Sequence, residues 1–346
     1  MTGFRVRGVI EGFYGPVWPW AERLDLVPFL AARGFNAYAY APKNDPLHRD
    51  RWREPYLPED WDRFAQLTHR CAEADIDFVF GVSPLGLRFT DLEPDADDLG
   101  ALIAKFAAAD AIGVRTFCLL VDDMPARGAG GDATSGAGGD ATPGAGGDLN
   151  PGDAPATPDV RLVQRVHRAV TEFGPGRRLW FVPQPYCGDT DTPYLRQLGR
   201  EVPLDVDICW TGPQVCAAEV TLEHARAVEA SLRRPFLLWD NHPVNDGGMR
   251  HDPHLGPLRG RDPRLPEAAA GIVANLALQP EASRIAVATV GEYAADPAST
   301  SRRCPGVERW PRWPATMPMP RRSRLWPIWR VAVRWSRGGG TPRSRP

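Results

Sequence analysis

The chain has 346 residues, a hydrophobic fraction of 43% and a formal net charge of −2. This length suits one large α/β domain or two ordinary ones, and the balanced charge gives no reason to expect nucleic acid or a membrane as a partner. No apolar stretch approaches the length of a transmembrane helix, and the N-terminus has no apolar signal region, so a cytoplasmic protein is expected. The six cysteines lack C-x-x-C spacing, which favours reduced, buried thiols over disulfides or a zinc site.

Short apolar runs alternate with amphipathic segments as far as about residue 295. The amphipathic segments predict helices, for example over 21–33, and apolar residues recur at helical spacing near 61–71, 99–106 and 162–170. Eight apolar runs predict strands: Arg5–Ile10, Asn36–Tyr40, Ile76–Val82, Thr116–Val121, Leu179–Val182, Val206–Trp210, Phe236–Trp239 and Ile285–Val290. Eight strands that alternate with helices are typical of a (β/α)8 TIM barrel, although a doubly wound open sheet uses similar units.

The position of the polar residues favours the barrel. A polar side chain follows each predicted strand: Glu11, Lys43, Ser83, Asp122, Tyr186, Thr211, Asp240 and Glu292. A barrel active site is built from residues at the carboxyl ends of its strands.

Two adjacent carboxylates, Asp122 and Asp123, close the buried run Thr116–Val121. Burying a charge without a partner costs several kcal/mol, so packing does not explain this pair. If both side chains face one cleft, their repulsion should raise one pKa and leave the other group ionised, which suits acid catalysis beside a charged stabiliser. A solvated turn after the strand is the alternative, because aspartate is common in turns.

Two segments do not fit a compact domain. Residues 126–158 repeat Gly-Ala-Gly-Gly-Asp without apolar residues to form a core, which predicts a flexible insert in a catalytic domain spanning 1–300. Residues 301–346 mix arginine, proline and tryptophan with no period, and we interpret them as a disordered or out-of-frame tail.

The ordered motifs of residues 5–297 resemble the family 84 glycoside hydrolases. These motifs are Gly8-Val-Ile-Glu-Gly-Phe-Tyr-Gly15, Tyr40-Ala-Pro-Lys43, Asp122-Asp123, Tyr186-Cys-Gly188, Trp210-Thr-Gly-Pro213 and Trp239-Asp-Asn241. The family comprises β-N-acetylglucosaminidases, including O-GlcNAcases and hyaluronidase-like relatives. The resemblance implies a TIM-barrel enzyme with no metal or organic cofactor, which acts on a glycan or glycoprotein that carries terminal β-linked GlcNAc.

The resemblance also implies substrate-assisted catalysis with retention of configuration. The 2-acetamido oxygen of the sugar attacks the anomeric carbon and gives an oxazoline. Asp122 matches the residue that orients and polarises the acetamido N–H, and Asp123 matches the general acid, neutral beside an anionic Asp122. The remaining matches concern substrate binding: Gly12, Lys43, Asp246 and Asn275 for sugar hydroxyls, and Tyr186, Trp239 and Asn241 for the acetamido pocket.

Several other interpretations remain open at this stage. Trp239 and Trp210 could be core aromatics, since both end apolar strands. Gln184-Pro185 departs from the Thr-Glu pair that the family more commonly places before the tyrosine. A GlcNAc-binding barrel with impaired catalysis is one rival function. A metal-dependent hydrolase that uses Asp122, Asp123 and Asp246 as oxygen ligands is the other.

Overall fold

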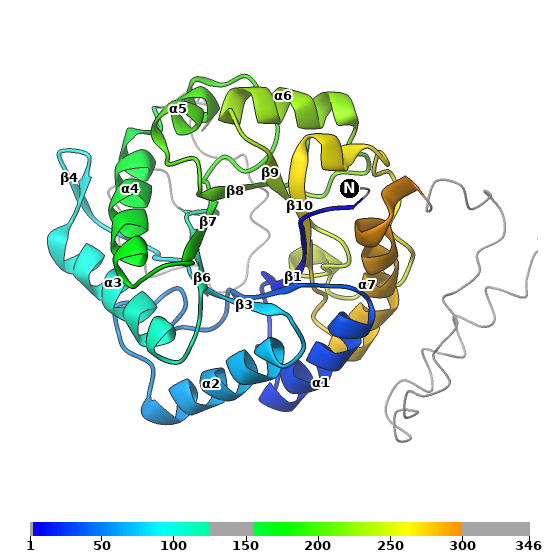
Figure 1. Ribbon diagram of the computed structural model, residues 1–346, viewed down its shortest axis with the longest axis horizontal. Helices are drawn as coiled ribbons and strands as arrows, with labels where there is room; N and C mark the ends of the chain where they lie inside the picture. Colours follow the sequence, from blue (N-terminus) through cyan, green and yellow to red (C-terminus); the bar gives the residue numbers. More distant parts are fainter. Residues whose placement is uncertain (1–2, 125–154, 299–346) are drawn as a thin grey trace, which may run out of the picture. The chain divides into compact units, whose positions relative to one another are not determined.

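The computed structural model describes residues 3–124 and 155–298, and all of these lie within one compact unit. Its centre is a closed barrel of parallel strands surrounded by helices (Figure 1). The strands follow the order β1-β10-β9-β8-β7-β6-β3-β2 around the barrel. They are β1 (Val6–Glu11), β2 (Ala37–Tyr40), β3 (Asp77–Val82), β6 (Thr116–Leu120), β7 (Arg178–Val182), β8 (Asp207–Trp210), β9 (Phe236–Asp240) and β10 (Ala269–Asn275). The predicted (β/α)8 fold is confirmed.

Seven α-helices of the described residues form the outer layer. They are α1 (Trp20–Ala32), α2 (Pro58–Ala72), α3 (Ala96–Ala111), α4 (Thr157–Glu172), α5 (Pro193–Glu201), α6 (Leu222–Leu232) and α7 (Pro280–Ala295). A two-stranded hairpin of β4 (Phe89–Thr90) and β5 (Glu93–Pro94) precedes α3. The long connection from β9 to β10 holds only the 3-10 turns η2 (Gly247–Met249) and η3 (Leu265–Glu267).

One strand and one helix differ from the sequence prediction. Ile285–Val290 is not the eighth strand but part of α7, and Glu292 therefore lies on a helix rather than at a strand end. The buried positions Ala282, Ala286 and Val290 recur every four residues, so the run is apolar because one helix face is buried. The eighth strand is β10. The sequence does not predict this strand, because it is rich in alanine and contains a glycine, and both residue types are depleted in strands.

The barrel closes between β1 and β10, where Val6 pairs with Gly271. A Cβ atom at Gly271 would lie 2.5 Å from the Cβ of Val6, so the two backbones can approach this closely only at a glycine. The barrel interior is filled by small and branched residues together with Trp180 and Trp239. It is therefore a packed core, as is usual for this fold.

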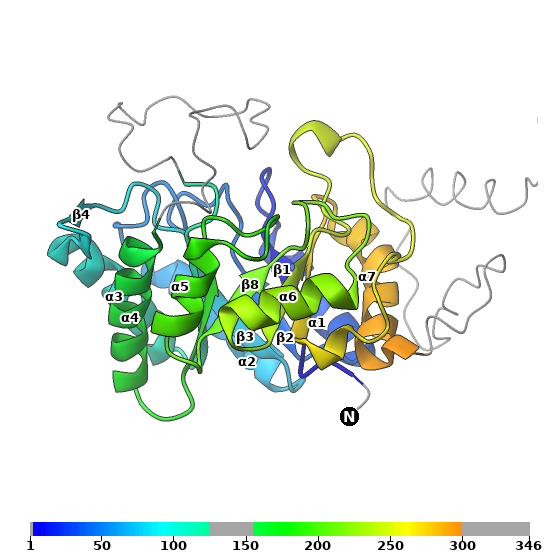
Figure 2. The same ribbon diagram turned by 90° about the horizontal axis from the view of Figure 1, so that it is seen from above.

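The last two residues of the range predicted as a flexible insert, 126–158, belong to a helix, because α4 begins at Thr157 and Pro158 is buried in it. Residues 125–154 and the predicted tail at 301–346 lie outside the described residues. None of the helices in the described ranges is long and apolar enough to cross a membrane. In Figure 2 the chain enters β1 from the lower end of the barrel, and the loop after β9 rises at the upper end, where the carboxyl ends of the strands lie.

Candidate active site

The nine residues predicted for the site all lie at or just beyond the carboxyl ends of barrel strands. Gly12 follows β1, Lys43 follows β2, and the aspartate pair follows β6. The others come from the remaining arc of the barrel, between β1 and β6: Tyr186 after β7, Trp239 within β9, Asn241 and Asp246 after β9, and Asn275 at the end of β10. Parallel strands deliver their carboxyl ends to one rim, so residues far apart in sequence meet there.

Asp122 is buried and paired with a buried lysine. The Lys43 Nζ atom lies 2.6 Å from Asp122 Oδ2, and the two side chains are only 1% and 8% exposed. Within the part of the chain that the structure describes, the other carboxylate oxygen, Oδ1, has no hydrogen-bond partner. Burial raises the pKa of Asp122, the Lys43 ammonium opposes that rise, and the neighbouring Asp123 adds to it.

Asp123 is exposed and is held by two tyrosines from different strand ends. Tyr186 Oη donates to Oδ1 at 2.8 Å, and Tyr14 Oη donates to Oδ2 at 3.0 Å. Burial raises the pKa of both tyrosine hydroxyls, and the charge of Asp123 raises it further. Both phenols therefore stay protonated and available as donors at neutral pH.

A second hydrogen-bonded group lies across the rim. Asn275 Oδ1 accepts from the Gly12 backbone N–H at 3.0 Å, and Asn275 Nδ2 donates to Asn241 Oδ1 at 2.9 Å. The same oxygen of Asn241 accepts from Trp239 Nε1 at 2.9 Å. A Cβ atom at Gly12 would lie 2.4 Å from Trp239 Cζ2, so glycine at this position lets the backbone pack directly against the indole.

Asp246 joins this arrangement through Tyr14. Its Oδ2 accepts from the Tyr14 backbone N–H at 2.7 Å, so the loop after β9 is attached to the loop after β1. Asp246 is half-buried, and burial raises the pKa of its carboxyl group. A continuous set of contacts therefore links Asp246 to Asp123 through one tyrosine.

Some strand-end residues have structural roles instead. Trp210, which the sequence left as pocket wall or core, is 1% exposed and donates to His224 on α6, so it is a core residue. Glu11 forms a buried ion pair with Arg23 of α1. Asp240 forms a two-bond ion pair with Arg261, at 2.6 and 2.8 Å.

The carboxylates of the rim are not arranged as a set of metal ligands. Among the described residues, no group of three or more histidine, cysteine, aspartate or glutamate side chains is placed to hold a metal ion. Asp122 Oδ2 is bound to an ammonium, both oxygens of Asp123 to phenols, and Asp246 Oδ2 to a backbone N–H. The geometry therefore disfavours the metal-dependent hydrolase.

Three residues that contact the site were not assigned a role from the sequence. Tyr14 lies within a quoted motif, so the motif itself was the signal. Arg49 Nη2 donates to the Asp123 carbonyl at 2.9 Å, and Gln184 Nε2 donates to the Met124 carbonyl at 3.0 Å. Neither contact has a signal in a single sequence, since an arginine or glutamine in a loop is most often on the surface.

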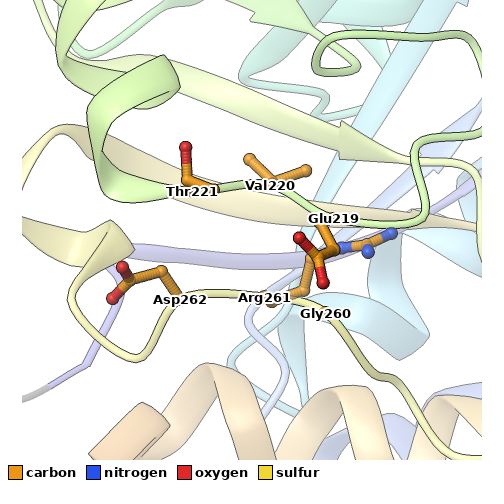
Figure 3. Close-up of a pocket in the computed structure, with 6 residues that line it drawn as sticks. All are labelled: Glu219, Val220, Thr221, Gly260, Arg261 and Asp262. Atoms are coloured by element: carbon orange, nitrogen blue, oxygen red, sulfur yellow. The ribbon is translucent and has the colours of Figure 1, made fainter.

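A separate surface hollow of about 250 Å³ is lined by residues 219–221 and 260–262 (Figure 3). The two segments face each other, and Val220 pairs with Arg261. The charged groups of this hollow include Arg261 and Asp262, which are already paired with Asp240 and Arg264. It brings together none of the predicted site residues, and we place the candidate active site at the barrel rim.

The fold is a (β/α)8 barrel, and a buried and an exposed carboxyl group lie side by side at the carboxyl ends of its strands. Active sites of enzymes with this fold lie at that end of the barrel. A family model described as beta-N-acetylglucosaminidase matches residues 7–304. The chain therefore belongs to this family, glycoside hydrolase family 84, as the motifs predicted.

Individual relatives agree with this placement. The protein O-GlcNAcases of Rattus norvegicus and Mus musculus are each 29% identical to the chain over 292 residues, which is 83% of this chain and 29% of theirs. The chain thus spans less than a third of the length of these relatives. A solved aspartate-to-asparagine mutant of the Thermobaculum terrenum O-GlcNAc hydrolase is 36% identical, with a TM-score of 0.74, and the match covers 85% of this chain and 60% of that one.

Proposed function

We propose that the chain is a retaining exo-β-N-acetylglucosaminidase that removes terminal β-linked GlcNAc by substrate-assisted catalysis, as an O-GlcNAcase does. Family membership supports the substrate class. The observation that carries the mechanism is the free oxygen of Asp122. A buried carboxylate with one oxygen on a lysine and the other without a partner is a ready acceptor for one N–H donor.

In this proposal the N–H of the 2-acetamido group donates to Asp122 Oδ1. The acetamido carbonyl oxygen then attacks the anomeric carbon, the glycosidic C–O bond breaks, and an oxazoline forms. Positive charge develops on the acetamido nitrogen during this step, so an anionic Asp122 stabilises the transition state more than the ground state. The Lys43 ammonium favours the ionised form of Asp122 and so opposes the effect of burial on its pKa.

Asp123 serves as the general acid and then the general base. It is exposed, whereas Asp122 is buried, so it can reach the glycosidic oxygen of a bound substrate. No cation is hydrogen-bonded to its carboxyl group among the described residues, in contrast to Asp122. Asp123 protonates the leaving oxygen and afterwards takes a proton from the water that opens the oxazoline.

The other rim residues suit the sugar and its acetamido arm. The Trp239 indole, packed against Gly12 and fixed by Asn241, supplies an apolar wall for the acetamido methyl group. Asp246 supplies acceptors for sugar hydroxyls, and the Tyr186 hydroxyl lies beside the acid pair. Sugar recognition commonly pairs an aromatic surface with carboxylates that accept hydroxyl hydrogen bonds.

The test compares an aryl β-GlcNAc with the aryl β-glucoside that lacks the acetamido group. We expect hydrolysis of the first and none of the second, with NMR showing the β-anomer as the first product. Asp123→Asn should lower kcat/KM by about 100-fold to 10,000-fold, the usual contribution of a general acid. Asp122→Asn should also lower it strongly. A chelator should leave the rate unchanged.

Equal cleavage of the glucoside would refute substrate assistance. Tight binding of a GlcNAc analogue without product release would instead establish the rival function, a GlcNAc-binding barrel with impaired catalysis. Loss of activity in the presence of the chelator would restore the metal-dependent alternative.

A further inference from the structure

The backbone that carries Asp123 has little support from regular structure. β6 ends at Leu120, and Asp123 and Met124 are outside any helix or strand. Asp123 has φ = +53°, in the left-handed region of backbone conformation that residues other than glycine rarely adopt. Such a conformation persists only where the surrounding structure holds it.

Two side-chain donors hold this segment by its carbonyl oxygens. Arg49 Nη2 donates to the Asp123 carbonyl at 2.9 Å, and Gln184 Nε2 donates to the Met124 carbonyl at 3.0 Å. They come from opposite sides, since Arg49 lies in the loop after β2 and Gln184 in the loop after β7. Neither is hydrogen-bonded to the Asp123 carboxyl group.

Arg49 is itself fixed in place. It is 6% exposed, and its Nη1 donates to Ser83 Oγ, just beyond β3, at 2.7 Å. Its Cζ lies 5.9 Å from the centre of the Tyr14 ring, at the limit of a cation–π contact, and Tyr14 in turn donates to Asp123 Oδ2. Arg49 therefore restrains the backbone of Asp123 directly. Through the ring contact it also restrains Tyr14, which donates a hydrogen bond to the Asp123 carboxyl group.

We propose that Arg49 and Gln184 are positioning residues that hold the general acid in its left-handed conformation. This inference rests on the proposed function, in which Asp123 protonates the leaving group. Proton transfer depends steeply on geometry, and a displacement of about 1 Å can cost on the order of 100-fold in rate. The loss should appear only where the leaving group needs the proton.

The experiment uses the full chain and two aryl β-GlcNAc substrates, a phenyl glycoside with a poor leaving group and a dinitrophenyl glycoside with a good one. We measure kcat/KM, which reports the first, bond-breaking step. Arg49→Lys keeps the charge but cannot bond two partners with one planar group. We expect it to lower kcat/KM by about 10-fold to 100-fold on the phenyl glycoside and by less than about 3-fold on the dinitrophenyl glycoside.

Gln184→Ala should change the ratio of the two values in the same direction, by a smaller factor, because it removes the more distant of the two contacts. Gln184 is only partly buried, so this variant tests the proposal even if Arg49→Lys fails to fold. Arg53→Lys is the matched control: Arg53 lies on the same loop but binds Asp98 and the Gly86 carbonyl, and its replacement should leave the ratio unchanged.

Asp123→Asn is the reference, because it removes the proton donor and should show the largest dependence on the leaving group. If Asp123→Asn shows that dependence while Arg49→Lys and Gln184→Ala do not, the positioning role is refuted and the proposed function stands. An equal loss on both substrates also refutes it, since that is the result of a general structural defect. If the wild-type chain cleaves neither substrate, the proposed function fails and the positioning role fails with it.

Discussion

The contact between Lys43 and Asp122 allows the sharpest test of the charge arrangement, through the variant Lys43→Met. Methionine fills a similar volume without the charge. The Nζ–Oδ2 distance is 2.6 Å and both side chains are buried, so solvent screens the pair weakly. Removing one partner of a buried ion pair costs about 3–5 kcal/mol, because the other charge is left without compensation.

The free-energy cost of leaving the Asp122 charge uncompensated should appear as a shift in the pKa of Asp122. Burial already raises the pKa of Asp122 and the ammonium opposes the rise, so Lys43→Met should raise that pKa further. Asp122 would then carry a proton over a wider pH range and could no longer stabilise positive charge on the acetamido nitrogen. At about 1.4 kcal/mol per tenfold, kcat/KM should fall by roughly 100-fold to 4,000-fold at acidic and neutral pH.

The assay is the pH profile of kcat/KM on an aryl β-GlcNAc. The acidic limb should lie at higher pH in Lys43→Met than in the wild type, with partial recovery of activity at alkaline pH. Lys105→Met is the matched control, because Lys105 is also buried but donates to the Leu47 carbonyl and not to Asp122. Its acidic limb should coincide with that of the wild type. An unchanged limb in Lys43→Met would refute the reasoning.

Thermal unfolding gives a second readout with a defined sign. An acid whose folded-state pKa is raised above its unfolded value binds more protons when folded, so its contribution to stability falls as pH rises through that range. Lys43→Met raises the folded-state pKa of Asp122 further. The Tm difference from the wild type should therefore be smallest at acidic pH and should grow as pH rises. A Tm difference that is independent of pH would contradict this.

Three further predictions concern single contacts. Tyr186→Phe removes the donor to Asp123 Oδ1 at 2.8 Å and should lower kcat/KM by about 10-fold to 100-fold, the range for a hydrogen bond to a charged group; a value within twofold of the wild type would contradict it. Gly12→Ala places a Cβ atom 2.4 Å from Trp239 Cζ2, so the indole must move; KM should rise, and an unchanged KM would show that Trp239 does not line the sugar site. Gly271→Ala forces β1 and β10 apart and should cost about 1–3 kcal/mol of stability, measured by thermal unfolding, while KM stays near the wild-type value; an unchanged Tm would contradict the packing argument.

The barrel could be read from the sequence because most of its strands are apolar runs rich in branched and aromatic residues. Phe78–Val82 and Phe117–Leu120, for example, are buried throughout. β10 was missed because its alanines and Gly271 satisfy close packing against β1, a tertiary requirement that outweighs strand propensity. The run in α7 was misread for the complementary reason, since a short apolar run does not distinguish a buried helix face from a strand.

The membership of the site could be predicted, but its contacts could not. Functional residues of a barrel gather at the carboxyl ends of its strands, and this rule located Lys43 and Tyr186 from the order of the predicted strands. Asn275 was expected only from the family resemblance, because its strand, β10, was not predicted. The contacts of Arg49 and Gln184 go to backbone carbonyls. Every residue type has the same backbone carbonyl, and the position of that carbonyl depends on the local φ and ψ. No pattern of residue types could therefore predict these hydrogen bonds.

The aspartate pair shows how local backbone conformation sets the surroundings of two neighbouring side chains. Side chains alternate across a strand, and Cys118 and Leu120 of β6 point into the barrel, so Asp122 continues the inward series and Asp123 should point away. The positive φ of Asp123 breaks the alternation. Its carboxyl group therefore meets Tyr14 and Tyr186, which come from strand ends separated around the barrel. Two neighbouring residues thus lie at the same rim in different environments: Asp122 is buried against an ammonium, and Asp123 is exposed and bound by phenols. In the proposed mechanism this difference gives identical side chains different roles.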